Sequence, residues 1–208
     1  MPSKNPANDA IKDASMRSIV LASTSPYRRQ LLAQLEFSFI TAAPLYVEKL
    51  DQSVSPELLV KHLAYHKAES LRKHYPDALI IGSDQVFVDP RNRILGKPGA
   101  FDRAVAQLKA MAGRSHTFYT GVAVFDSRSG EAAVDYSTFS VTLRDLSDEQ
   151  IRSYLRRENP LDCAGSFKIE GLGIALMERM EGDDYTSLIG LPLIKLTGML
   201  QQFGVEVL

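Results

Sequence analysis

The sequence predicts an α/β fold in which helices flank a mixed, twisted sheet and two lobes face a cleft. Strand and helix patterns alternate over the first half of the chain, which is typical of neighbouring strands joined by helices. Two long alternating segments, 116–126 and 133–145, then predict an antiparallel hairpin across the turn Ser-Arg-Ser-Gly. Because the chain has no internal repeat and no low-complexity linker, we expect a single domain over residues 17–208, after a disordered polar lead-in over residues 1–16.

The first half of the domain contains three predicted strands and two predicted helices. Ser25 followed by Pro26 is a typical helix start, because serine caps free N–H groups and proline suits the first turn. Ser55 and Pro56 repeat this signal before a helical face of leucines, and we expect Pro76 to end that helix. The third strand is nearly continuous in apolar character, as expected where both faces are covered. The predicted strands are 17–22, 37–44 and 78–88.

Three further helices complete the prediction. Residues 101–113 have helical periodicity and stop at Gly113, since glycine readily adopts the left-handed conformation that ends many helices. Ser147 is the expected cap of a helix over residues 147–159, and residues 191–204 form the last predicted helix.

Composition and charge exclude several classes of protein. The 208 residues are 45% hydrophobic, which is normal for a globular chain, and a net charge of -1 argues against a broad surface for nucleic acid or anionic membrane. Cys163 is the only cysteine, so no internal disulfide can form and a reducing, cytoplasmic location is favoured. No apolar run approaches the ~20 residues that a membrane span needs.

The common signatures of nucleotide and hydrolase sites are missing from the sequence. There is no P-loop motif, and no glycine-rich dinucleotide fingerprint follows a strand. The zinc motif H-E-x-x-H and the serine elbow G-x-S-x-G are also absent. Any catalytic site must therefore be built from less familiar residues.

The third strand carries an unusual polar pair. In the stretch IIGSDQVFV, Asp84 and Gln85 lie between apolar residues that favour burial. A buried carboxylate is costly unless it meets a cation, a metal ion or strong hydrogen-bond donors. We therefore interpret Asp84 as a functional residue.

A second polar group stands where the first strand gives way to a helix. Helix starts attract phosphate through free N–H groups, and hydroxyl and guanidinium donors add to this attraction. The plainer interpretation is a capping serine and two solvated arginines. The residues concerned are Ser23, Ser25, Arg28 and Arg29.

Three more charged residues are candidates for the same site. Lys67 lies on the second predicted helix, Lys97 lies in a Gly-Lys-Pro turn, and Glu48 lies in a loop. Each is also compatible with an ordinary place on the surface, so the pattern of residues alone leaves both interpretations open.

Several separated motifs match one pattern in order and spacing. They are LASTSPYRRQLL, the Glu48 loop after AAP, IIGSDQVFV, ILGKP, HTFYTGVAVF, CAGSFKIEGLG and LIGLPL. Together they resemble the Maf family of nucleotide pyrophosphatases, over nearly everything from Ile19 to the end. The resemblance implies a fold like that of Maf proteins and inosine triphosphatases, and a homodimer.

The resemblance also implies a reaction and roles for the candidate residues. A nucleoside triphosphate would be hydrolysed between its α and β phosphates with a divalent metal, Mg²⁺ or Mn²⁺. Asp84 would accept the proton of the attacking water, and Asp84 and Glu48 would bind the metal. The family often has an Asp-Glu pair here, whereas Val47 precedes Glu48 in this chain, so this loop would offer the metal fewer carboxylate ligands than usual. The expected phosphate ligands are Ser23, Ser25, Arg28, Arg29, Lys67 and Lys97.

The sequence around Asp84 bears on the base of the substrate. The Maf subgroup that acts on dTTP and UTP typically has Ala-Asp-Thr, whereas Ser-Asp-Gln here resembles the subgroup that acts on 7-methyl-GTP, with CAGSFKIEG in agreement. Tyr27, Gln85 and Glu170 would then set specificity. Glu170 can accept hydrogen bonds from guanine, Tyr27 can face the positive methylated ring, and Gln85 can offer both a donor and an acceptor.

Alternatives from the sequence are a pyrophosphatase for dTTP and UTP, one of broad action on modified nucleotides, and a nucleotide-binding regulator of cell division that lacks turnover. The expected partner is a nucleoside triphosphate rather than a nucleic-acid polymer or a membrane.

Overall fold

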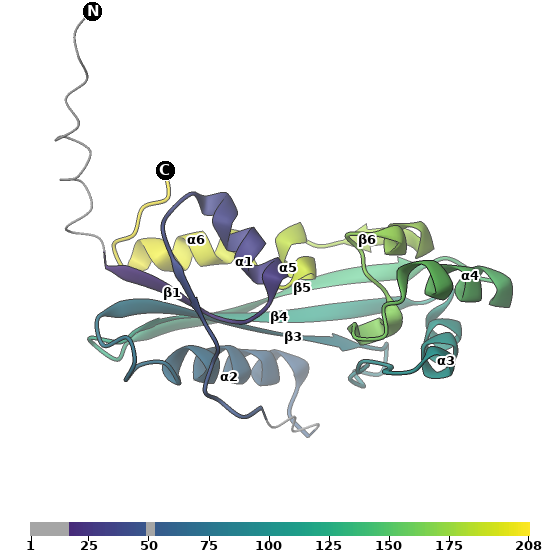
Figure 1. Cartoon of the computed structure of the whole chain (residues 1–208), viewed down its shortest axis with the longest axis horizontal. Helices are drawn as coiled ribbons and strands as arrows, with labels where there is room; N and C mark the ends of the chain where they lie inside the picture. Colours follow the sequence, from purple (N-terminus) through teal and green to yellow (C-terminus); the bar gives the residue numbers. More distant parts are fainter. Residues whose placement is uncertain (1–16, 49–52) are drawn as a thin grey trace, which may run out of the picture.

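The computed structural model describes residues 17–48 and 53–208, so the predicted lead-in over residues 1–16 lies outside the described residues. A six-stranded mixed sheet runs through the molecule in the order β2-β1-β3-β4-β5-β6 (Figure 1). β2, β1 and β3 are parallel, and the remaining pairs are antiparallel. The strands are β1 (Ser18–Ala22), β2 (Ile40–Ala42), β3 (Ala78–Val88), β4 (Ser115–Asp126), β5 (Ala132–Leu143) and β6 (Met177–Glu181).

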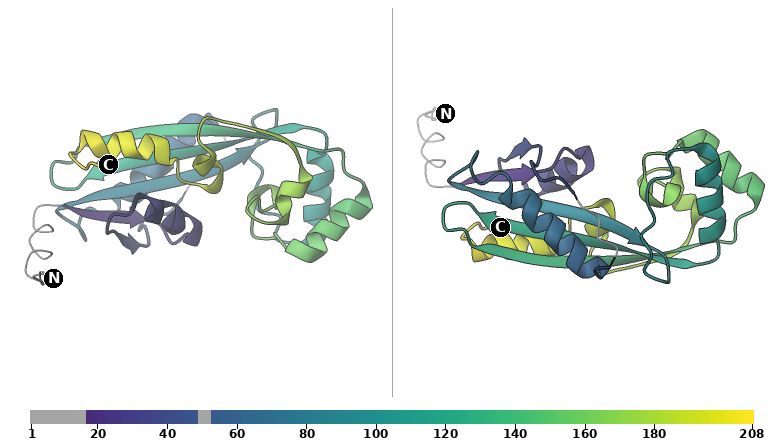
Figure 2. Two further views of the ribbon diagram at one scale, coloured as in Figure 1. Left: turned by 90° about the horizontal axis from the view of Figure 1, so that it is seen from above. Right: turned by 90° about the horizontal axis from the view of Figure 1, so that it is seen from below.

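Helices cover both faces of this sheet and gather at its two ends. α2 packs on one face, α1, α5 and α6 pack on the other, and α3 and α4 form a separate group at the far end (Figures 1 and 2). The predicted α/β class with two lobes is confirmed. The helices are α1 (Pro26–Leu32), α2 (Pro56–Glu69), α3 (Phe101–Met111), α4 (Asp148–Glu158), α5 (Tyr185–Ile189) and α6 (Leu193–Gln202).

Strand register explains how a residue in the middle of a strand can reach a ligand. β1 pairs with β3 only as far as the partners Leu21 and Ile81. Beyond that point β3 continues from Gly82 to Val88, while the chain of β1 turns away into α1. The edge of β3 is therefore uncovered on the β1 side where Asp84 and Gln85 lie, at the carboxyl end of β1.

Two glycines allow α2 to lie unusually close to the sheet. A Cβ atom at Gly82 would collide with the carbonyl of Ala64, and one at Gly121 would collide with the carbonyl of Val60. Asp84 and Gly121 are cross-strand partners, so the close approach occurs beside the acid. The absence of side chains at these two positions thus brings the backbone of α2, and with it Lys67, to Asp84.

Several element boundaries differ from the predicted ones. α2 ends at Glu69 rather than just before Pro76, because the hydroxyl of Ser70 donates to the carbonyl of Lys67 at 2.8 Å and the chain continues in turns. β2 is only three residues long, since Phe37 and Phe39 pack against the core instead of joining the ladder. β6 and α5 were not predicted, because both are short.

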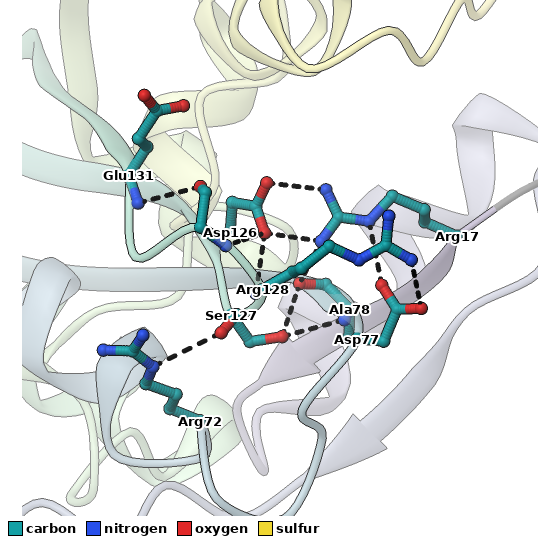
Figure 3. Close-up of polar contacts among 9 residues, drawn as sticks. Arg17, Arg72, Asp77, Ala78, Asp126, Ser127, Arg128 and Glu131 are labelled. Carbon is teal, nitrogen blue, oxygen red and sulfur yellow. Dashed lines mark hydrogen bonds and ion pairs between the residues drawn. The ribbon is translucent and has the colours of Figure 1, made fainter.

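A network of charges closes the end of the sheet remote from Asp84 (Figure 3). Arg17 donates two hydrogen bonds to the carboxylate of Asp126, at 2.7 and 2.5 Å, and Asp77 lies 3.3 Å from the Arg17 Nε atom. Arg128 contacts the other oxygen of Asp77 at 2.5 Å. The Arg17 guanidinium beside Asp126 holds the pKa of that carboxyl well below its usual range. The network fastens the start of β1 to the β4–β5 turn.

Replacing Asp126 by Asn is expected to lower the free energy of unfolding at pH 7 by about 3 kcal/mol, because Arg17 loses its buried charged partner. The depressed pKa of Asp126 contributes its full stabilisation above the ordinary carboxyl pKa, near pH 4, and loses it progressively as the pH falls from there toward the folded-state pKa, so the difference between the two proteins should be smaller at pH 3 than at pH 7. Urea unfolding at pH 7 and pH 3 measures both effects. Asp183→Asn, at an exposed aspartate, is the control, and an equal loss in both variants would contradict the prediction.

Candidate active site

A cleft of about 550 Å³ lies at the carboxyl end of β1 and along the uncovered edge of β3. Its lining comes from the β1–α1 turn, from β3 and α2, and from the loop after β3. Eight of the eleven site residues predicted from the sequence line this cleft. They are Ser23, Ser25, Arg28, Glu48, Lys67, Asp84, Gln85 and Lys97.

Asp84 meets its cation in the cleft. Its side chain lies on the α2 face of β3 and accepts a hydrogen bond from the ammonium group of Lys67, which is as deeply buried as the acid. The same ammonium lies 2.7 Å from a carboxylate oxygen of Glu48. Lys67 thus stands between two carboxylates, and it supplies the partner that the position of Asp84 in an apolar strand requires.

The pKa of Asp84 is shifted in the direction that makes its carboxylate a stronger base. Burial raises the pKa of the Asp84 carboxyl, while Lys67 and Arg28 oppose this effect and Glu48 adds to it. A carboxylate with a raised pKa is a stronger base than an exposed one, provided that the nearby cations keep it ionised.

The turn between β1 and α1 supplies donors to the cleft. Ser25 caps α1 as predicted, because its hydroxyl accepts a hydrogen bond from the Arg28 backbone at 3.4 Å. Its own N–H donates to the hydroxyl of Ser23 at 3.1 Å. The Nε atom of Arg28 donates to the carbonyl of Gly190 at 2.8 Å, which holds the guanidinium in the cleft. Arg29 is exposed and does not line the cleft, so the structure does not bring it together with the others.

A second, smaller cavity of about 160 Å³ adjoins the cleft. Gln85 and Ala164 line both cavities, so the two are adjacent. All three residues predicted to set specificity line this second cavity, which we call the base pocket: Tyr27, Gln85 and Glu170. Its remaining lining is Phe118, Cys163, Ala164, Phe167, Lys168, Ile169, Leu188 and Ile189.

Gln85 enters the base pocket with a fixed orientation. Its Nε2 atom donates to the hydroxyl of Thr120 at 2.9 Å and to the carbonyls of Ser187 and Leu188 at 2.8 and 3.1 Å. An amide nitrogen has two hydrogens, so these acceptors occupy its donor capacity. The amide oxygen is the group left for a ligand, and the prediction that Gln85 offers a donor as well is wrong.

Sequence reasoning missed the groups that hold Gln85 and Arg28. Their acceptors are mainly backbone carbonyls of α5 and the turn after it, at Ser187, Leu188 and Gly190. A backbone carbonyl leaves no signal in the sequence, and the only hint was the motif LIGLPL, whose side chains suggest no chemistry.

Cys163 lies in the base pocket, where burial raises the pKa of its thiol to about 11, so it stays protonated at neutral pH.

Asp84 and Glu48 are two carboxylates close to one another, and carboxylate oxygens are the ligands that hard metal ions prefer. Among residues 17–48 and 53–208 there is no cluster of three or more His, Cys, Asp or Glu side chains that could hold a metal. Asp84 and Glu48, however, both contact the same ammonium, so both lie around one point of positive charge. Mg²⁺ is commonly bound by one or two carboxylates together with water and substrate phosphates, which fits this pair.

The comparison with known families agrees with this arrangement. A family model described as Maf-like protein matches residues 18–203. The chain belongs to the Maf family. This confirms the resemblance seen in the separated motifs, because the matched range includes every residue that lines the cleft and the base pocket of this Maf protein.

Several relatives of this Maf protein carry the name 7-methyl-GTP pyrophosphatase. The protein of that name from Syntrophotalea carbinolica is 65% identical over 193 residues, which cover 93% of this chain and 98% of the relative. The one from Colwellia psychrerythraea is 49% identical, with 93% and 96% covered. Among solved structures, the Ham1 protein of Staphylococcus aureus aligns with a TM-score of 0.46 and 16% identity over 75% of this chain and 89% of that chain, a likeness too distant to carry a conclusion.

Proposed function

We propose that this Maf protein hydrolyses 7-methyl-GTP to 7-methyl-GMP and pyrophosphate and so removes a modified nucleotide from the pool. The observation that carries the proposal is the pair of adjacent cavities: a cleft with a buried acid among cations, and a pocket lined by Tyr27 and Glu170 that shares Gln85 with the cleft. The names of the relatives from S. carbinolica and C. psychrerythraea support the same substrate.

Asp84 acts as the base in this proposal. A water molecule attacks the α phosphorus, its proton passes to the Asp84 carboxylate, and the bond from the α phosphorus to the bridging oxygen breaks as pyrophosphate leaves. Arg28 and Lys97, from two different segments of the cleft lining, bind the polyphosphate, and Ser23 and Ser25 add hydroxyl groups. Lys67 keeps Asp84 ionised. Arg29 is exposed, and its charge acts on the anionic nucleotide only at long range.

A divalent metal belongs to the proposal, with Asp84 and Glu48 as its protein ligands. When bound, Mg²⁺ or Mn²⁺ supplies positive charge that offsets the charge developing on the phosphates. Val47 lies where the family often has a second acid and is exposed, so Glu48 is the only carboxylate that the described part of this loop provides. A homodimer belongs to the proposal on the strength of the family alone, and a cytoplasmic location on the strength of the single cysteine, Cys163.

The base pocket favours a guanine base over a pyrimidine. Guanine presents donors at N1 and at its amino group, and the amide oxygen of Gln85 and the carboxylate of Glu170 are both acceptors. Methylation at N7 adds a positive charge, which an aromatic face such as Tyr27 and a carboxylate both attract. Thymine or uracil offers fewer donors and would leave an acceptor unpaired.

The test is release of pyrophosphate from a panel of 7-methyl-GTP, GTP, dTTP and UTP, with and without EDTA. We expect 7-methyl-GTP to be the best substrate and EDTA to abolish its turnover. Faster turnover of dTTP or UTP would overturn the substrate assignment, and similar rates over the panel would favour a broad activity. Binding of 7-methyl-GTP without pyrophosphate release would favour a regulator.

Replacing Glu170 by Gln is expected to lower kcat/KM for 7-methyl-GTP by about 30-fold, because a hydrogen bond to a charged group contributes about 1.5–3 kcal/mol. The kcat/KM for UTP should change by less than about threefold, since uracil does not pair with the Glu170 carboxylate and the neutral amide removes only this unpaired acceptor. Glu178→Gln, at an exposed glutamate of β6, is the matched control. Equal losses for both nucleotides would show that Glu170 supports the fold of the pocket rather than recognition of the base.

A further inference from the structure

Two loops from different parts of the chain meet where the cleft adjoins the base pocket. The loop after β3 contributes Gly96 and Lys97 to the cleft, and residues 163–170 contribute much of the base pocket. Ala164 belongs to the second loop and lines both cavities. The separation of these loops therefore sets the distance between the group that meets the polyphosphate and the groups that meet the base.

Gln107 of α3 is hydrogen-bonded to both loops at once. Its Nε2 atom donates to the carbonyl of Gly96 at 3.1 Å, and its Oε1 atom accepts a hydrogen bond from the hydroxyl of Ser166. A backbone hydrogen bond from Gly99 to Leu161, at 2.9 Å, joins the same two segments nearby. Gln107 lines neither cavity, so it acts on a ligand only through the loops.

The loop that Gln107 holds has a demanding backbone conformation. Ser166 is fully buried and has a φ of 61°, in the left-handed region that a serine seldom adopts. Gly165 before it has a φ of 75°, and a Cβ there would crowd the ring of Phe87. Consecutive left-handed residues persist only where their surroundings hold them, and the hydroxyl of Ser166 is held by Gln107.

We propose that Gln107 is a positioning residue that matches the base pocket to the phosphate cleft and so contributes to substrate selection. The inference rests on the proposed function of the two cavities. A nucleotide that is bound at both its base and its phosphates binds more tightly when the distance between the base pocket and the cleft is fixed, because both ends then bind without further ordering of the loops. A nucleotide that is bound mainly through its phosphates gains little affinity from this fixed distance.

Steady-state kinetics of Gln107→Met and Gln107→Glu test the role in selection. Met has a similar length but makes neither hydrogen bond, so we expect kcat/KM for 7-methyl-GTP to fall about tenfold, through KM more than kcat, while UTP stays within about twofold. Glu can still accept from Ser166 but turns a carboxylate oxygen toward the carbonyl oxygen of Gly96, so it should lower kcat/KM for 7-methyl-GTP at least as much as Met does. Gln201→Met, at an exposed glutamine of α6, is the matched control. Equal losses for both nucleotides, or none for either, would overturn the proposal.

Hydrogen exchange without any nucleotide gives a second test that does not depend on activity. Ser166→Ala removes one of the two hydrogen bonds of Gln107, and we expect faster amide exchange in residues 96–99 as well as in the altered loop, with a melting temperature lowered by only about 2–4 °C. Unchanged exchange at 96–99 would overturn the coupling of the loops even in an active enzyme. Faster exchange there, in a protein that does not hydrolyse 7-methyl-GTP, would overturn the proposed function and leave the coupling standing.

Discussion

Replacing Asp84 by Asn is expected to lower kcat for 7-methyl-GTP by about 10³-fold or more at neutral pH. The amide has nearly the same shape but cannot take up the proton of the attacking water, and it is a weaker ligand for a divalent metal. Lys67 keeps Glu48 as a charged partner, so the helix that carries the lysine should stay in place. Pyrophosphate release measures the rate, and circular dichroism verifies the fold.

The same variant separates an enzyme from a nucleotide-binding regulator. If catalysis is the function, Asp84→Asn should bind 7-methyl-GTP yet lose the cellular effect of the gene, whereas a regulator would keep that effect. Asp183→Asn changes an exposed aspartate outside both cavities and should keep full turnover. Retention of more than about a tenth of the wild-type rate in Asp84→Asn would contradict the role of Asp84 as the base.

The position of Asp84 shows what sequence could predict and where prediction stopped. An acid inside an apolar strand signalled an unusual partner, because burial of an unpaired carboxylate is too costly to persist. That Lys67 is the partner depends on the close approach of α2 over Gly82, which is a tertiary contact between distant segments. The glycines were visible in the sequence, but nothing local connected them to α2.

Gln85 and Arg29 show the opposite limits of sequence reasoning. Successive side chains of a strand point to opposite faces of the sheet, so the side chain of Gln85 points away from the α2 face, where Asp84 lies, and toward α5. Its donor is then occupied by carbonyls of α5, a helix of five residues too short to give a periodic signal. Arg29 matched the motif, but one step along α1 from Arg28 is about 100° around the helix, which turns its side chain away from the cleft.

Lys67 controls the protonation of the proposed base. It is the first of the groups that lower the pKa of Asp84 against the effect of burial, and Arg28 is the second. Removal of its charge should therefore raise the pKa of Asp84 further, and the carboxylate form would be populated only at higher pH. The buried position of the pair makes this effect stronger than at a surface salt bridge.

Replacing Lys67 by Met is accordingly expected to lower kcat/KM for 7-methyl-GTP by about 10²-fold at pH 7 and to move the acidic limb of the pH–rate profile to higher pH. Lys67→Arg keeps the charge, so its acidic limb should stay near that of the unmodified protein even if its rate falls. The double variant Asp84→Asn/Lys67→Met should unfold at higher urea concentration than Lys67→Met at pH 8, because it no longer contains a buried carboxylate without its cation. An acidic limb that stays in place in Lys67→Met would show that Arg28 or a bound metal, rather than Lys67, keeps Asp84 ionised.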